Sequence, residues 1–261
     1  MNVMSKLDIR SKGMDKLSFK KLLNRFENKL SSIPLYEHKK EFCSIRTVEK
    51  NLYGKLNPTA FMDDIFFNQC KCLTYDEFAK EYITKLHSSL DLHRLQEYDG
   101  MEWDDFEKGL KARLWRTYAG IMTEYHAYLK CKLIFGVDKV IRDINLDRLG
   151  VDFSINNGNN GNNGNNGNDY HIHIFCDTDR AWYYRAKKIK TRAGNSLKGI
   201  HVNFPYGIYK KSKVNCNEVL PNGFIIYSDD YVKLLKREIE NGGIKNDNIC
   251  GIEEDSFKYK N

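Results

Sequence analysis

Residues 149 to 190 hold the side chains best suited to chemistry. Asp152 lies in the apolar stretch LGVDFSI, and His171 and His173 alternate with isoleucine in YHIHIF. Successive side chains of a strand point to opposite faces, so both histidines are expected on one face. A carboxylate can bind a hard cation, and a neutral imidazole can act as a general base or ligate a transition metal. These two strands are therefore the candidate catalytic centre, and two structural histidines are the alternative.

A second carboxylate, Glu124, lies earlier in the chain, beside the apolar stripe of a long helical stretch. A partly buried carboxylate needs a cation, a metal ion or hydrogen-bond donors. Glu124 is therefore a candidate metal ligand. The alternative is a glutamate at the rim of the core that pairs with a Lys or Arg.

The segment after YHIHIF is basic and aromatic. Residues 177–192 contain six Lys or Arg and two Asp, interleaved with Trp182, Tyr183 and Tyr184. Basic and aromatic side chains together suit a phosphate backbone with nearby bases or sugars. A solvated basic helix is the alternative. The candidate nucleic-acid contacts are Arg180, Tyr184, Arg185, Lys187, Lys188 and Lys190.

Helices and strands must position these groups. Helical spacing of apolar residues predicts helices near residues 17–30, 74–90 and 104–133. Thr74 and Glu77 have the spacing of a capping box at the start of the second helix, and Ser228 is expected to cap a helix over 229–240. Strands are expected at 137–144, 151–155, 170–175, 199–204 and 224–227, with a turn at 147–150. The Asn/Gly run at 156–168 reads as a flexible hairpin loop. The fold class is therefore α/β, a mixed central sheet flanked by helices.

This pattern divides the chain in sequence order. We expect a helical N-terminal region at 1–100, an α/β core at 101–245 and a polar tail at 246–261. No apolar run approaches the roughly 18 residues of a membrane helix, and no secretory signal is evident at the N-terminus. Seven scattered cysteines suggest free thiols in a reducing compartment, so the cytoplasm is expected. A net charge of +7 favours an anionic partner.

Taken together, the arrangement resembles the PD-(D/E)XK nuclease superfamily, and particularly its type II restriction endonucleases, over roughly residues 113–230. The resemblance places Glu124 as the helix glutamate, Asp152 as the strand aspartate and YHIHIF as the third strand. It implies Mg²⁺, with Mn²⁺ as an alternative, held by Asp152 and Glu124, double-stranded DNA as substrate and a homodimer. The type II enzymes hydrolyse phosphodiester bonds, so DNA endonuclease activity is the first hypothesis.

The third strand departs from the family pattern. His171 and His173 stand where an acidic residue and a lysine are expected, so the two histidines would orient water or complete the metal coordination. Lys187 or Lys188 could supply the missing positive charge. Loss of catalysis with retention of nucleic-acid binding is the second hypothesis. A protein-interaction role for the helical N-terminal half is the third. No G-x-S-x-G, P-loop, G-x-G-x-x-G or H-E-x-x-H motif is present.

Overall fold

The contacts of the chain group it into two compact units. The computed structural model describes residues 15–48, 57–87, 100–157, 169–188, 197–207, 215–245 and 247–251. Of these, the first unit holds 24–48, 57–87, 100–122 and 221–224, and the second unit holds the rest. The grouping does not follow sequence order, so the division at residues 100 and 245 stays a prediction.

Helices make up most of the first unit. They are α2 (Lys39–Phe42), α3 (Pro58–Asp63) with its π-helical continuation η2 (Asp64–Asn68), α4 (Tyr75–His87), the end of α1 (Lys16–Ser31) and the first part of α6 (Trp103–Phe135). The predicted capping box is confirmed, since Glu77 Oε2 accepts from Thr74 N at 2.7 Å. Tyr118, from α6, is fully buried and its hydroxyl donates to Leu73 O at 2.8 Å.

The helix α6 confirms the longest sequence prediction. The apolar residues spaced by three or four, Phe106, Leu110, Leu114, Tyr118, Ile121, Tyr125 and Leu129, are all buried. Gly136 ends the helix with φ of +114° and donates its N–H to Lys132 O, as expected of a glycine stop. The helix contributes to both units, with residues 103–122 in the first and 123–135 in the second.

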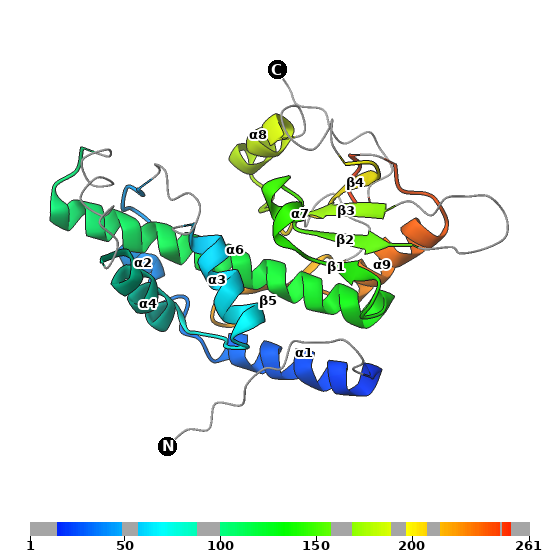
Figure 1. Cartoon of the computed structure of the whole chain (residues 1–261), viewed down its shortest axis with the longest axis horizontal. Helices are drawn as coiled ribbons and strands as arrows, with labels where there is room; N and C mark the ends of the chain where they lie inside the picture. The colour runs from blue at the N-terminus through cyan, green and yellow to red at the C-terminus, as the bar shows by residue number, and fades with distance from the viewer. Residues whose placement is uncertain are drawn as a thin grey trace. The chain divides into compact units, whose positions relative to one another are not determined.

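A mixed sheet forms the centre of the second unit (Figure 1). In the described part of the chain its order is β1 (Val140–Ile141), β2 (Phe153–Asn156), β3 (Asp169–His173) and β4 (Ile200–Asn203). The pairs β1–β2 and β2–β3 are antiparallel, and β3–β4 is parallel. The crossover between β3 and β4 contains α8 (Asp179–Lys188). The predicted α/β class with a mixed central sheet is confirmed.

One local prediction was wrong. The strand expected at 137–144 shrinks to β1, because Asp143 caps a short helix, α7 (Ile144–Arg148), by accepting from Asn145 N and Leu146 N. The helix overlaps the expected turn at 147–150, which is present: Gly150 N donates to Asp147 O at 2.8 Å. A short strand that was not expected, β5 (Asn217–Val219), pairs with β6 (Ile225–Tyr227). The Asn/Gly run lies outside the described residues from 158 onward.

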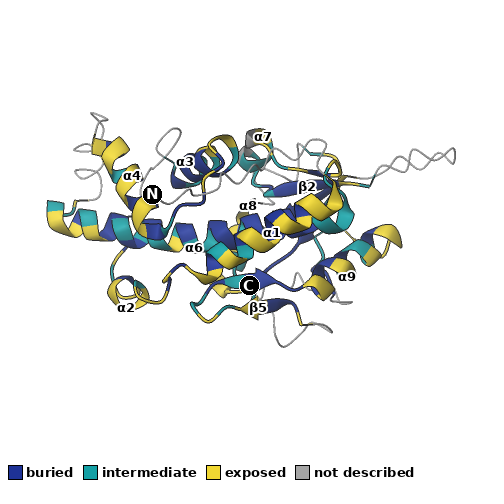
Figure 2. Cartoon of the chain, turned by 90° about the horizontal axis from the view of Figure 1, so that it is seen from below, coloured by how far each residue is buried: buried dark blue, intermediate teal, exposed yellow. Residues whose placement is uncertain are grey.

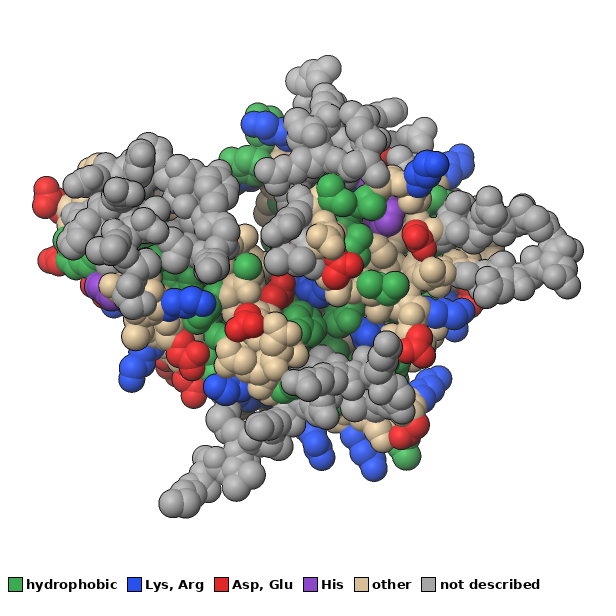
Figure 3. All heavy atoms as spheres, in the orientation of Figure 1, with side chains coloured by type: hydrophobic (Ala, Val, Ile, Leu, Met, Phe, Trp, Pro, Cys, Tyr) green, Lys and Arg blue, Asp and Glu red, His purple; other side chains and the backbone are tan. Residues whose placement is uncertain are grey.

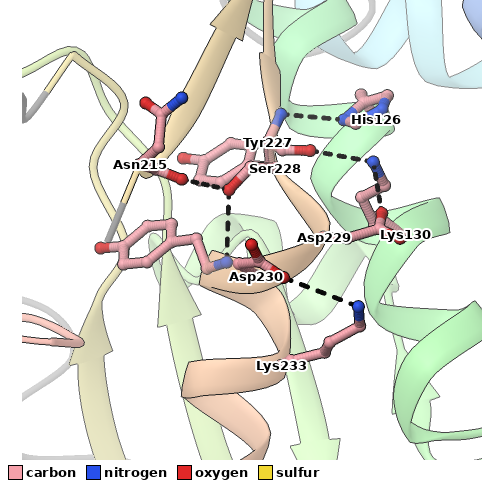
Figure 4. Close-up of polar contacts among 9 residues, drawn as sticks. His126, Lys130, Asn215, Tyr227, Ser228, Asp229, Asp230 and Lys233 are labelled. Carbon is pink, nitrogen blue, oxygen red and sulfur yellow. Dashed lines mark hydrogen bonds and ion pairs between the residues drawn. The ribbon is translucent and has the colours of Figure 1, made fainter. Parts of the chain in front are cut away.

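A buried polar joint fixes α9 (Asp229–Glu240) to α6 within the second unit (Figure 4). His126 Nδ1, on a fully buried ring, accepts from Tyr227 N at 3.2 Å. Lys130 Nζ donates to Tyr227 O at 3.0 Å and pairs with Asp229 Oδ1 at 2.8 Å. As predicted, Ser228 caps the helix by accepting from Tyr231 N at 3.2 Å.

The outer helices are amphipathic. Figure 2 shows α1 and α9 with buried residues along one side and exposed residues along the other. In α9 the buried residues are Tyr231, Val232, Leu235 and Ile239. In α1 Leu17 departs from the predicted stripe, with 63% of its surface exposed. None of the helices in the described segments combines the length and apolarity that a membrane span requires.

Candidate active site on the histidine-bearing face of the sheet

The two faces of the four-stranded sheet differ in chemistry. The pairs Phe153–Ile172 and Ile172–Val202 place apolar side chains on one face, where the Phe153 ring contacts Tyr128 of α6. The pairs Ser154–His171, His171–His201 and His173–Asn203 place polar side chains on the other. We call these five residues, Ser154, His171, His173, His201 and Asn203, the histidine face. All five are buried, at 0 to 7% exposure.

The ring nitrogens of the two predicted histidines are bonded to protein groups. His171 Nδ1 lies 2.8 Å from Ser154 Oγ, and His171 Nε2 lies 3.2 Å from Lys198 O. His173 Nδ1 lies 2.9 Å from Gly150 O, and its Nε2 lies 2.9 Å from His201 Nδ1. A carbonyl only accepts, so each histidine donates from the nitrogen that faces one. To orient water or to complete a metal site, either histidine would have to exchange one of these hydrogen bonds, so both roles stay predictions.

His201 is a member of this network that the sequence analysis missed. Its ring stacks on His173 with centroids 5.2 Å apart. Burial, with smaller contributions from His171 and Arg185, lowers the pKa of His201 to about 4, so the ring is neutral at pH 7. The signal was present: GIHVNF has the same alternation as YHIHIF, and a parallel neighbour brings the two strands into register.

An arginine connects the Glu124 carboxylate to the backbone of Asp152. Arg142 Nη1 donates to Glu124 Oε1 and, at 2.9 Å, to the backbone carbonyl of Asp152. The side chains of Arg142 and Glu124 are only 6% and 14% exposed. The Asp152 carboxylate lies at the end of β2 and accepts from Ile174 N, beyond the end of β3. Asp152 and Glu124 therefore belong to one neighbourhood, and Glu124 has the arginine partner that was the alternative to a metal.

The fit of a Mg²⁺ ion can be tested on these donors. Among the described residues, no three His, Cys, Asp or Glu side chains lie close enough together to hold a metal ion. However, Mg²⁺ is commonly held by one or two carboxylates, and water and substrate phosphate complete its shell. Asp152 and Glu124 supply hard oxygen donors of that kind. Their donor chemistry suits the ion, but Glu124 would have to exchange its bond with Arg142 for one with the ion.

The predicted DNA contacts on α8 fall into two groups. Arg180 and Lys187 are exposed, and Tyr183 and Tyr184 are 55% and 49% exposed with ring centroids 5.4 Å apart. The guanidinium of Arg180 lies 5.8 Å from the centre of the Tyr184 ring. Arg185, by contrast, is buried against the histidine face. The side chain of Lys188 and all of Lys190 lie outside the described residues.

The face of the molecule shown in Figure 3 has no single basic patch among the described residues. Lys and Arg side chains there are interspersed with Asp and Glu. On this face, the position of individual cations matters more than their number.

Comparison with known proteins gives these residues a context. A model of the TaqI restriction endonuclease family matches residues 23–215, which include Glu124, Asp152 and the histidine face. The type II restriction enzyme TaqI of Thermus aquaticus is 24% identical over 249 residues, covering 83% of this chain and 87% of that enzyme. The type II restriction enzyme TthHB8I of Thermus thermophilus is 23% identical over 245 residues, with the same two coverages.

No solved structure matches the chain significantly. The family model spans more than half of the chain, and the predicted resemblance to type II restriction endonucleases is thereby confirmed. On the basis of this match, the chain belongs to the TaqI restriction endonuclease family.

Proposed function

We propose that this protein is a type II restriction endonuclease that hydrolyses phosphodiester bonds of double-stranded DNA. The observation that carries the proposal is the family match over residues 23–215, which spans the α6 carboxylate and the strands of the mixed sheet. The neighbourhood of Asp152 and Glu124 supplies the acidic groups that a metal-dependent phosphodiesterase needs.

Asp152 and Glu124 are the residues that would hold Mg²⁺, or Mn²⁺ in its place. A bound divalent ion would neutralise phosphate charge and lower the pKa of a bound water. In this chain, Ile174 N orients the Asp152 carboxylate, and Arg142 holds Glu124 and would have to release it for Glu124 to serve as a ligand. The histidines are proposed to support the strands rather than to move protons, since their ring nitrogens already have protein partners.

The exposed face of α8 is proposed to contact DNA. Arg180 and Lys187 can pair with phosphates, and Tyr184, beside Tyr183, offers a flat surface for a sugar or a base. Lys188 and Lys190 are proposed as further phosphate contacts from the sequence alone. A homodimer on duplex DNA and a cytoplasmic location complete the proposal. The location is supported by seven free cysteines, five of them buried, which suit a reducing compartment.

Cleavage of plasmid DNA tests the enzyme proposal. Wild-type protein with Mg²⁺ or Mn²⁺ should produce discrete fragments, and Asp152→Ala should cut at least about 1000-fold more slowly while its melting temperature stays within a few degrees. Lys233→Met, a change on the exposed side of α9, serves as the matched control. Wild-type protein that binds duplex DNA but cuts it with neither ion would refute the enzyme proposal.

The same experiment evaluates the second candidate, a non-catalytic DNA-binding protein. Two observations favour this candidate: the third strand carries histidines in place of an acidic residue and a lysine, and Glu124 already has a cationic partner in Arg142.

The third hypothesis is a protein-interaction role for the N-terminal half. It predicts binding to a protein that salt does not weaken, and no DNA affinity at low salt.

A further inference from the structure

Arg185 is a buried cation whose hydrogen bonds are incomplete. Its side chain is 3% exposed. Nε donates to Asn203 Oδ1 at 2.9 Å, and Nη2 reaches Asp247 Oδ1 only at 3.4 Å. Nη1 is buried and has no hydrogen-bond partner among the described residues. A buried donor without a partner costs about 1–3 kcal/mol and calls for an explanation.

The surroundings of Arg185 leave its charge only partly balanced. Burial lowers the pKa of Arg185 to about 10, while Asp247 and Asp152 act in the opposite direction. The group therefore stays charged at neutral pH and lies within the electrostatic reach of Asp152. Its neighbour His201 is neutral, and Asn203 carries no charge. Among the described residues, the carboxylate in contact with the guanidinium is that of Asp247, whose Oδ1 lies 3.4 Å from Nη2.

The other buried arginine of this neighbourhood has a different role. Arg142 pairs with Glu124, donates to the Asp152 carbonyl, and lies 5.4 Å from the centre of the Tyr125 ring. A new anion at Arg142 would compete with Glu124 for its charge. Arg185 can accept a second anion through Nη1 without giving up Asn203.

We propose that Arg185 binds a phosphate oxygen of the DNA backbone at the Asp152 site, with the phosphate joining or replacing Asp247 as its anionic partner. A guanidinium presents a planar fork of donors that matches a phosphate group. It would supply from α8 the positive charge that the third strand lacks at His173. Because Nη1 is buried, binding requires the neighbouring groups to move, and the weak contact with Asp247 is the one most easily exchanged. This inference rests on the proposed function.

Arg185→Met and Arg185→Lys test the role of Arg185, with Arg237→Met, an exposed arginine of α9, as the control. In the presence of Mg²⁺, Arg185→Met should cut DNA about 100-fold more slowly per folded molecule. Added guanidinium ion at concentrations that do not unfold the protein should restore part of that rate, and methylammonium should not. Arg185→Lys keeps the charge but not the fork, so its cleavage should fall by about 10-fold. If Arg185→Met does not fold, this lysine variant becomes the deciding one.

A binding experiment separates this inference from the proposed function. With Ca²⁺ in place of Mg²⁺, duplex binding should weaken in Arg185→Met, and its dependence on log salt should become shallower by about 0.9. Arg237→Met should leave that slope unchanged. If the wild type does not cut DNA, the slope still decides whether Arg185 contacts phosphate. A normal slope with normal cleavage per folded molecule in both Arg185 variants would overturn the inference and leave Arg185 a structural link between α8 and β4.

Discussion

The second unit contains two buried polar networks that differ in how fully they are bonded. In the joint between α6 and α9, His126 and Lys130 bond to both backbone groups of Tyr227, and Lys130 also pairs with Asp229 (Figure 4). On the histidine face, Arg185 retains a donor without a partner among the described residues. Burial of polar groups is costly in both places, and among the described residues the side chains of His126, Lys130 and Asp229 recover more of that cost than Arg185 does.

This difference suggests a criterion for separating scaffold from site. A network that satisfies itself needs no ligand, and loss of one member should reduce stability. A network in which one donor has no partner could bind a ligand through that donor. Loss of the donor should then reduce ligand binding or cleavage more than it reduces the free energy of unfolding. Substitutions can show to which kind of network individual residues belong, and Glu124 should give the largest effect and Ser228 the smallest.

Substitution of Glu124 tests whether its ion pair with Arg142 stabilises the fold. Glu124→Gln should leave the buried charge of Arg142 unpaired and lower the free energy of unfolding, measured in urea without metal, by about 3 kcal/mol. The double variant Glu124→Gln/Arg142→Met should regain most of this loss, but not cleavage. A stable Glu124→Gln protein that has lost cleavage would place Glu124 in the site alone.

Lys130 tests the joint. Lys130→Met removes the donor to Tyr227 O and the partner of Asp229, so we expect a loss of about 2 to 3 kcal/mol in the free energy of unfolding. The matched control is Lys233→Met, whose partner Asp230 is also exposed, with an effect below about 0.5 kcal/mol. Equal effects for the two lysines would remove the distinction between a buried and an exposed pair.

His201 tests the histidine face through pH. Its folded pKa of about 4 lies below the ordinary value of 6.5, so the unfolded chain binds the proton first. Its contribution to stability is complete above pH 6.5 and decreases as the pH falls toward 4. The loss at pH 5 is about 2 kcal/mol. Urea unfolding from pH 7.5 to 5 should show this loss in the wild type and not in His201→Gln.

The His201→Gln variant is the baseline for this measurement. Burial raises the pKa of Asp247, so protonation of that carboxyl raises the free energy of unfolding as the pH falls, opposite in sign to the effect of His201. If both proteins lose stability equally on acidification, His201 is not the group responsible.

Ser228 should give the smallest effect. Ser228→Ala removes the acceptor for Tyr231 N at the start of α9 and should cost about 1 kcal/mol in thermal or urea unfolding. Asp and Asn at this position should retain most of the capping energy. Because the cap belongs to the joint, cleavage per folded molecule should be unchanged in all three variants; reduced cleavage would link α9 to the site.

The sequence predicted the elements better than their mutual contacts. Helical periodicity gave α6 its full buried stripe, and short-range capping rules placed the starts of α4 and α9. The capping role of Asp143 was not predicted, so the residues of α7 were assigned to a strand and the following turn. The pairing of Arg142 with Glu124 depends on how β1 docks beside β2, which no local pattern specifies.

The candidate site was predicted only in part for the same reason. Asp152, Glu124 and the two histidines were proposed from residue type and alternation, and their roles stay predictions. The parallel pairing of β3 with β4, which adds His201 and Asn203 to the same face, joins strands separated by a crossover. The burial of Arg185 was also invisible, because α8 carries exposed and buried basic residues within two turns.

The hairpin register has a practical consequence for protein engineering. Asn156 pairs with Asp169 at one end of β2 and β3, while Asp152 bonds to Ile174 at the other. The Asn/Gly run therefore joins the strands at the end remote from Asp152. A dye or an affinity tag could be inserted there with the length of both strands between the addition and Asp152. A change in the number of NNG repeats should be tolerated for the same reason.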